Sequence, residues 1–288
     1  MFKKKYAIFT MDVEAFTDTE CVAYSKENID IDLLDGFDEY IKILDENNIK
    51  CTMFTVGNLA PKIYDKLQHC IINGHELALH NYEHIPPTKI ETETFKKNLV
   101  KTKKELSQMF NAEISGFRAP FFSIDRQHLD IIKEIGFKYD SSHLDFLAAR
   151  HTVNLKINDF EKISKNIYSN GNFFEFGLPI YKMFGFPYPI SGGGYIRLGN
   201  WPFIKTLIKQ YLQKNDYYVF YLHPFELTKQ QIPVLKGLKL YDKFYLRYGI
   251  KNYAKHIKQL IAILKKLGYS FVTFDELTNK LLKEKSEF

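Results

Sequence analysis

The chain has 288 residues, 45% of them hydrophobic and 26% charged, which predicts a globular core of one α/β domain or two small ones. The net charge of +6 is spread along the sequence, whereas a nucleic-acid-binding protein usually carries a stronger and localised basic patch. We therefore expect no nucleic acid partner. The three cysteines are far apart and form no CxxC pair, which argues against a disulfide framework.

Short runs typical of strands alternate with longer helical patterns along the chain. In chain order we expect a strand at 6–11, a helix at 31–48, a strand at 51–56, a helix at 59–75, a strand at 76–80, a helix at 91–110, a strand at 114–120, a helix at 126–136, strands at 137–142 and 173–178, a helix near 201–214, a strand at 217–223, a helix at 251–267, a strand at 269–274 and a helix from Asp275 onward. Residues 143–172 give no clear pattern. The stretch 224–250 reads as a long, irregular and functional loop.

This alternation predicts a parallel sheet in a (β/α) barrel with seven or eight strands. An open doubly wound sheet is the alternative. The glycine signature of dinucleotide-binding folds is absent after the first strand, where the sequence reads TMDVEAFTD. No repeat or linker interrupts the sequence, so we expect a single domain over residues 1–288.

Several polar residues fall at or just beyond the carboxyl ends of the expected strands. They are Asp12, Glu14, His80, His84, Arg118, Asp140 and His223. In a parallel barrel these strand ends meet on one face, and active sites lie on that face. Singly, each residue has an ordinary structural explanation, such as a cap, an ion pair or a core histidine. Together they predict a functional site.

The stretch HNYEH, residues 80–84, places two histidines four residues apart. It is not the HExxH pattern of zincins, because Asn81 follows His80. A catalytic zinc-type site needs about three protein ligands and one open position. Asp12 and Glu14 are the candidates for the third ligand, since residues two apart on a strand point to the same side. Either carboxylate could bind the metal while the other takes a proton from water.

Six stretches resemble the polysaccharide deacetylases of the NodB-homology class, carbohydrate esterase family four, and the resemblance runs nearly end to end. They are FTMDVE, HNYEH, FRAPFFS, FKYDSS, SGGGYIRL and FYLHPFEL. The resemblance implies a distorted (β/α) barrel that removes acetyl groups from an N-acetylated sugar with the help of a metal. The Asp-x-Glu pair and SGGGYIRL resemble a subgroup linked to exopolysaccharide and surface-glycan synthesis. The sequence departs from the family in lacking a tryptophan after the fourth motif, since its one tryptophan is Trp201.

The resemblance leads to a mechanistic hypothesis. Glu14, His80 and His84 hold one divalent metal ion, with Zn²⁺ first and Co²⁺, Ni²⁺ or Fe²⁺ also compatible with these ligands. Asp12 is the general base, although the roles of Asp12 and Glu14 could be exchanged. Arg118 pairs with Asp12, His223 donates a proton to the leaving amine, and a backbone N–H near Phe121 stabilises the oxyanion. Asp140 orients His223 or Arg118.

The expected partner is an N-acetylated sugar or glycan, and the sequence does not define an oligomeric state. An allantoinase-like C–N hydrolase on the same fold and a non-catalytic glycan-binding protein are the alternatives. No window approaches 18 apolar residues, so we expect no transmembrane helix. The first apolar run reaches Asp12 and Glu14 too soon for a signal-peptide core, and we therefore expect a cytoplasmic protein.

Overall fold

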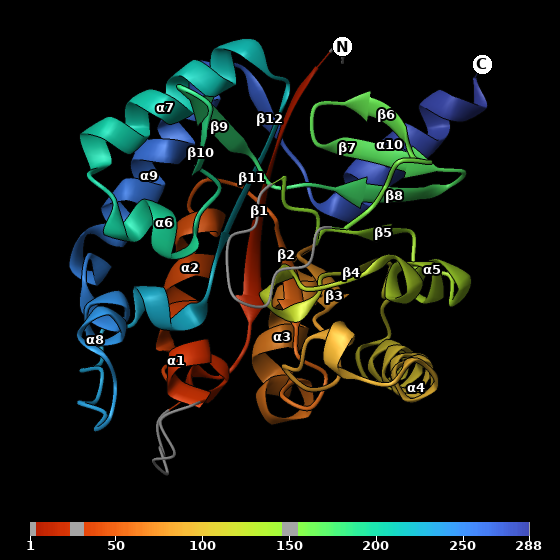
Figure 1. The fold of residues 1–288 in the computed structure, drawn as a ribbon, viewed down its shortest axis with the longest axis horizontal. Coiled ribbons are helices and arrows are strands. Elements are labelled where there is room, and N and C mark those ends of the chain that lie inside the picture. The colour runs from red at the N-terminus through yellow and green to blue at the C-terminus, as the bar shows by residue number, and fades with distance from the viewer. Residues whose placement is uncertain (1–3, 24–31, 146–154, 288) are drawn as a thin grey trace.

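The computed structural model describes residues 4–23, 32–145 and 155–287, and one large sheet organises them (Figure 1). Its strands are β1 (Lys5–Val13), β2 (Cys51–Thr55), β3 (Glu76–Leu79), β4 (Gly116–Phe117), β5 (Tyr139–Asp140), β6 (Glu161–Ser164), β7 (Ile167–Asn170), β8 (Phe173–Phe176), β11 (Tyr217–Leu222) and β12 (Tyr269–Phe271). The order is β11–β1–β2–β3–β4–β5–β8–β7–β6, and β12 also pairs with β1. A separate hairpin consists of β9 (Ile180–Met183) and β10 (Phe186–Pro189).

Eight of the described strands run parallel to their neighbours, which confirms the predicted seven or eight strands of a distorted barrel. The sheet curls into a half-barrel. Among the described residues, its order ends at β11 on one side and at β6 on the other. The antiparallel strands β6 and β7 extend the sheet beyond β8. They lie in the stretch 143–172, where the sequence pattern predicts no clear element.

The helices are α1 (Glu20–Ala23), α2 (Asp35–Asp45), α3 (Tyr64–Ile72), α4 (Thr92–Phe110), α5 (Arg126–Glu134), α6 (Gly193–Leu198), α7 (Trp201–Lys214), α8 (Leu240–Arg247), α9 (Ile250–Lys266) and α10 (Phe274–Ser286). Most match the expected helices to within a few residues. The expectation of an irregular loop over 224–250 is wrong for α8, and α6 was not expected. No helix among the described residues is long and apolar enough to cross a bilayer.

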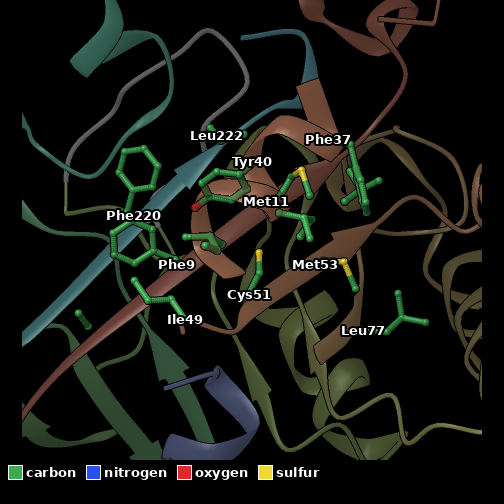
Figure 2. Packing of buried hydrophobic residues seen from close by; sticks show 14 of the residues in the cluster. Phe9, Met11, Phe37, Tyr40, Ile49, Cys51, Met53, Leu77, Phe220 and Leu222 are labelled. Carbon is green, nitrogen blue, oxygen red and sulfur yellow. The ribbon is translucent and has the colours of Figure 1, made fainter. Parts of the chain in front are cut away.

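Strand β1 shows how the sheet separates two hydrophobic layers, because alternate side chains point to opposite faces. Phe9 and Met11 pack outward against helices such as α2, beside Phe220 and Leu222 of β11 (Figure 2). Tyr6 and Ile8 point to the concave face, where they join residues of α10 in a second cluster. By the same alternation, the side chain of Asp12 also points to the concave face. The polar residues of β1 therefore lie on the inside of the half-barrel.

Candidate active site

The structure brings the predicted site residues to the carboxyl edge of the parallel strands. Asp12 lies near the end of β1, and Glu14 follows that strand directly. His80 follows β3, Arg118 follows β4, and Asp140 ends β5. His223 follows β11 and precedes a short 3₁₀ turn, η5 (Pro224–Leu227). Since β11 and β3 flank β1 and β2 in the sheet, these residues surround one point of the concave face.

Glu14, His80 and His84 form a compact cluster of potential metal ligands. One donor atom from each lies within 4.8 Å of the others. Nε2 of His84 is 2.7 Å from Oε2 of Glu14, and Nε2 of His80 is 3.9 Å from the same oxygen. Nδ1 of His80 is 2.7 Å from the carbonyl oxygen of Arg118, which is the usual second contact of a metal-binding imidazole. This contact places the proton on Nδ1 and leaves the Nε2 lone pair facing Glu14.

The cluster has unsatisfied polar atoms, which a bound cation would satisfy. Oε2 of Glu14 and Nδ1 of His84 are buried without a hydrogen-bond partner. The 2.7 Å contact between Glu14 and His84 therefore lacks hydrogen-bond geometry, as expected for two ligand atoms that face a common cation. Two imidazoles and one carboxylate are a donor set that suits Zn²⁺ and related metals. The residues present fit such an ion.

The ionisation of His80 and Glu14 suits metal binding as well, whereas Glu14 outweighs the effect of burial on His84 and raises its pKa, so that this imidazole would release a proton on binding a metal. Burial disfavours the charged forms of all three groups. It lowers the pKa of His80 to about 4, so this imidazole is neutral at neutral pH. For Glu14 the burial effect is outweighed by the positive charges of His84 and His223, and its pKa falls to about 2. A neutral imidazole and an ionised carboxylate are the forms that coordinate metals.

Asp12 is held by a buried arginine instead of by the histidines. Nη1 of Arg118 donates to Oδ1 of Asp12 at 2.6 Å and to Oγ1 of Thr10 at 2.9 Å. Its Nε and Nη2 donate to the carbonyl oxygen and the hydroxyl of Ser141. The guanidinium is fully buried and lies 4.0 Å from the ring centre of Phe54. The second oxygen of Asp12, Oδ2, lies 4.0 Å from Nε2 of His223.

His223 faces both carboxylates and is supported from behind by Glu226. Its Nε2 lies 4.0 Å from Asp12 Oδ2 and 4.0 Å from Glu14 Oε1, so the two carboxylates do point to the same side. Its Nδ1 is 3.2 Å from Oε2 of Glu226, which also accepts the backbone N–H of His223. Burial opposes the charged imidazolium, but Glu14 and Glu226 outweigh burial and raise the pKa of His223 to about 9.

Glu226 is held in turn by Arg197, a pairing that the sequence analysis missed. Nε of Arg197 donates to Oε1 of Glu226 at 2.9 Å, and both side chains are fully buried. Nη1 of Arg197 donates to the carbonyl oxygen of Tyr248. Arg197 belongs to the stretch SGGGYIRL and Glu226 to FYLHPFEL. Two motifs that are about thirty residues apart therefore form one unit behind His223.

The glycines of SGGGYIRL allow this unit to assemble. Gly192 pairs with Tyr221 of β11 in an isolated β-bridge, and its φ of +133° is unfavourable for other residues. A Cβ atom at Gly192 would lie 2.0 Å from the carbonyl oxygen of Tyr221, and one at Gly194 would lie 2.5 Å from the ring of Tyr245. These close approaches give the glycines a packing role.

Asp140 belongs to a second buried network, which lies behind Arg118. Its oxygens accept the N–H and the hydroxyl of Ser142 at 2.9 Å each, and it is hydrogen-bonded to Glu175 of β8. Burial raises the pKa of Asp140 to about 6 and that of Glu175 well above its usual value, so the two carboxyls share a proton. The described hydrogen bonds of Asp140 thus lead to Ser142 and Glu175, and Glu226 is the group that contacts His223.

The turn after Arg118 lies against the metal-ligand cluster. Phe121 and Phe122 have φ values of +56° and +54°, a conformation that is strained for aromatic residues and often found at functional sites. The ring of Phe121 lies 4.6 Å from the ring of His84. The N–H of Phe122 is bonded to the carbonyl oxygen of Ala119. Glu83, inside HNYEH, is exposed to solvent.

Comparisons with known proteins agree with this arrangement. The sequence profile of the polysaccharide deacetylase family matches residues 29–139, and that of a domain of unknown function (DUF3473) matches residues 149–279. A peptidoglycan deacetylase of Helicobacter pylori is 23% identical over 113 residues, which are 38% of this chain and 39% of that protein. A peptidoglycan-N-acetylglucosamine deacetylase of Bacillus cereus is 26% identical over 152 residues, 51% of this chain and 53% of that protein. The matches span a quarter to about half of these curated relatives.

Solved structures support the fold. A Mycobacterium smegmatis protein assigned to the polysaccharide deacetylases has a TM-score of 0.62 at 16% identity, covering 99% of this chain and 92% of its own. A pseudoenzyme of carbohydrate esterase family four from Bacillus anthracis has a TM-score of 0.53 at 12% identity, covering 96% and 66%. At these identities the likeness concerns the fold alone, and the fold by itself does not imply activity. Together with the motifs, the profile match identifies a polysaccharide deacetylase region at residues 29–139, similar to the NodB-homology class, carbohydrate esterase family four.

Proposed function

We propose that this protein is a metal-dependent deacetylase that hydrolyses the acetamido group of an N-acetylated sugar in a polysaccharide or glycan precursor. One observation carries the proposal. A cluster of three metal-ligand side chains lies between a carboxylate held by a buried arginine and a histidine that faces both carboxylates. Acyl hydrolysis needs an electrophile, a base for water and an acid for the leaving amine, and this site has a candidate for each role.

Glu14, His80 and His84 would hold the metal, with Zn²⁺ the first candidate and Co²⁺, Ni²⁺ or Fe²⁺ compatible. When bound, a divalent ion at this position polarises the acetyl carbonyl and lowers the pKa of water. Glu14 is preferred over Asp12 as the ligand for two reasons. Its Oε2 is the oxygen nearest to the histidines, and it has no hydrogen-bond partner. Asp12 Oδ1 is already engaged by Arg118.

Asp12 would act as the general base. Arg118 binds one of its oxygens, while the other oxygen faces His223 across the site. In the reaction Asp12 takes the proton of the attacking water, whose oxygen bonds to the acetyl carbon. Because Arg118 makes four hydrogen bonds to fixed partners, the carboxylate is aimed before the substrate binds.

His223 would donate a proton to the sugar nitrogen as the C–N bond breaks, giving acetate and a free amine. The contact of its Nδ1 with Glu226 leaves Nε2–H directed toward the two carboxylates. With a pKa of about 9, His223 carries its proton at neutral pH. Glu226 and Arg197 would be positioning residues for His223. Asp140 would support Arg118 indirectly, because Ser141, which bonds Arg118, follows it in the chain.

We further propose that residues 1–288 act as a single domain and that the substrate belongs to surface-glycan biosynthesis. The continuous sheet supports the first point, because β11 and β12 from the second matched region pair with β1. The resemblance of MDVE and SGGGYIRL to the exopolysaccharide-linked subgroup supports the second.

Metal content tests the ligand set. His80→Ala removes one proposed ligand, whereas Glu83→Ala removes an exposed carboxylate from the same HNYEH stretch and serves as the matched control. After purification and dialysis, elemental analysis should find about one metal per chain in the wild type and in Glu83→Ala, and little in His80→Ala. Full metal content in His80→Ala would place the metal elsewhere.

Acetate release tests the reaction. The same three proteins are incubated with N-acetylglucosamine oligomers and with peptidoglycan, and acetate and new amine groups are quantified. Release by the wild type and by Glu83→Ala, with loss in His80→Ala, is the expected result. Turnover of a cyclic ureide in place of the sugars would identify the allantoinase-like alternative. Absence of bound metal, together with binding of the sugars but no acetate release, would indicate a non-catalytic glycan-binding protein.

A further inference from the structure

The segment 234–255, which contains α8, exposes an unusual set of hydrophobic side chains. Among the described residues, fifteen large hydrophobic side chains are exposed, and five of these lie within residues 234–248. We call these five the α8 surface: Val234 (68% exposed), Leu240 (86%), Tyr241 (68%), Phe244 (47%) and Tyr248 (51%). Contiguous exposed apolar side chains usually mark an interaction site.

Helix α8 is apolar on two opposite sides. On its inner side, Leu246 is buried in a cluster with Phe225, and the ring of Tyr245 lies 5.3 Å from the Arg197 guanidinium carbon. On its outer side, Leu240, Phe244 and Tyr248 are four residues apart and line up, and the rings of Phe244 and Tyr248 stack at 4.4 Å. The inner side explains why the helix is held in place. The outer side serves no packing purpose among the described residues.

Basic residues accompany this apolar strip along the sequence. The segment 234–255 contains six lysines and arginines and one acid, a net charge of +5. Five of the six recur at every fourth position: Lys239, Lys243, Arg247, Lys251 and Lys255. Among the described residues, none of the four lysines in this row takes part in an ion pair, so their charges face solvent uncompensated. Figure 1 shows α8 at the lower edge of the molecule, beside α6 and α1.

We infer that the α8 surface docks on an anionic lipid bilayer. Short helices with lysines and arginines flanking leucine and aromatic residues lie in the interface of anionic membranes, where both parts contribute to binding. A glycan fits less well, because Leu240 and Val234 offer no ring for stacking on a sugar. A row of positive charge would also repel a deacetylated, amine-bearing product. The inference does not depend on the proposed reaction.

The α8 surface is connected to the catalytic edge through aromatic residues. The ring of Tyr245 packs against Gly194 of α6, where an added Cβ atom would lie 2.5 Å from it. On the inner side, the ring of Tyr245 also lies 6.4 Å from the ring of Phe225, which follows His223 by two residues and stacks 6.0 Å from its ring. Docking through α8 would therefore place the carboxyl edge of the sheet close to the lipid headgroups, where a membrane-borne glycan precursor would be within reach.

Vesicle binding by the full chain tests the inference. The probes are vesicles of phosphatidylcholine alone and of phosphatidylcholine with phosphatidylglycerol in a two-to-one ratio, and bound protein is measured by flotation. The wild type should bind the anionic vesicles, more weakly at high salt, and bind neutral vesicles far less. Lys239→Gln/Lys243→Gln should weaken binding about 25-fold, because each basic residue near an anionic surface contributes about fivefold.

A matched control uses α4, which is also basic. Lys97→Gln/Lys104→Gln removes the same charge from exposed positions on that helix and should leave vesicle binding unchanged. Phe244→Ser should weaken binding, whereas Phe186→Ser, at an exposed position on the β9–β10 hairpin, should not. Circular dichroism checks that each variant folds. Equal losses in the α4 and α8 variants, absence of anionic vesicle binding, or binding to insoluble peptidoglycan instead of vesicles would each overturn the inference.

Discussion

Two buried arginine–carboxylate pairs flank the candidate site, and they differ in what the carboxylate does next. Arg118 makes four hydrogen bonds to three residues, one of them to Asp12, and Asp12 keeps one oxygen toward the reacting space. Arg197 makes two described hydrogen bonds, one to Glu226 and one to the carbonyl oxygen of Tyr248, and its own Nη2 has no hydrogen-bond partner. The other oxygen of Glu226 contacts Nδ1 of His223. In the proposed reaction, the same chemical pair would therefore orient a base on one side and support an acid on the other.

The largest expected effect tests the side of Arg118. Asp12→Asn keeps the size of the side chain and a hydrogen-bond acceptor for Arg118 but removes the base, so kcat should fall by about 10²–10⁴. Metal content should stay at the wild-type level, because Glu14 and the histidines are untouched. Steady-state acetate release and elemental analysis measure the two quantities. Loss of metal in this variant would exchange the roles of Asp12 and Glu14.

A second test compares the stabilities of the two pairs. Arg118→Met leaves Asp12 buried without its partner and should lower the free energy of unfolding by about 3–5 kcal/mol. Arg197→Met should cost less, on the order of 2 kcal/mol, because Glu226 retains His223 and fewer hydrogen bonds are lost. Urea unfolding of the two variants and the wild type gives the ranking. Equal losses of unfolding free energy in the two variants would mean that the two pairs stabilise the fold equally.

A smaller effect is expected on the side of Glu226. Glu226→Gln removes the negative charge beside His223 and should lower kcat about tenfold, since one charge-assisted hydrogen bond weakens. Burial lowers the pKa of His223, but Glu14 and Glu226 outweigh burial and raise it to about 9. The charged form is lost as pH rises through that value. Without Glu226 the pKa falls, so the alkaline limb of the rate profile should move to lower pH. A merely structural role would lower the rate without moving the limb.

The smallest expected effect concerns Asp140 and Glu175. Their raised pKa values mean that the folded state keeps a proton that the unfolded chain releases, so stability should decline as pH rises through about 6. Glu175→Gln reproduces the protonated form, because its oxygen can accept from Ser142 and its amide can donate to Asp140. This variant should show a flatter pH dependence and be more stable by on the order of 1 kcal/mol at neutral pH. Thermal unfolding at several pH values would measure this dependence. Parallel curves of stability against pH for the variant and the wild type would contradict the shared proton.

The Arg118 side and the Arg197 side of the site also differ in how far the sequence predicts them. Polar residues at strand ends stand out against apolar strands, which is why Asp12, His80, Arg118 and His223 could be predicted from alternation alone. Glu226 carries a local signal, since it lies three residues after His223 in a capping box. Its pairing with Arg197 could not be predicted, because it depends on how α6 packs against β11.

Two further features were missed for physical reasons. Glu175 lies inside the aromatic run FFEFGL, and the charge within that strand was the available signal. Helix α8 was predicted as irregular because it has apolar residues on both its inner and outer sides, which hides the helical period. A pattern method looks for one apolar face. The feature that hides this helix from such a method is also the one that gives it an exposed surface.

The position of β1 in the sheet has a consequence for synthesis. Of its three partners, β2 follows about forty residues later, whereas β11 and β12 come more than two hundred residues later. During translation one edge of β1 therefore remains unpaired until β11 and β12 have been made. Such long-range pairings form slowly. His223 arrives with β11, in the same late step. A nascent chain thus has its proposed metal ligands well before its proposed acid, so premature hydrolysis on the ribosome is not expected.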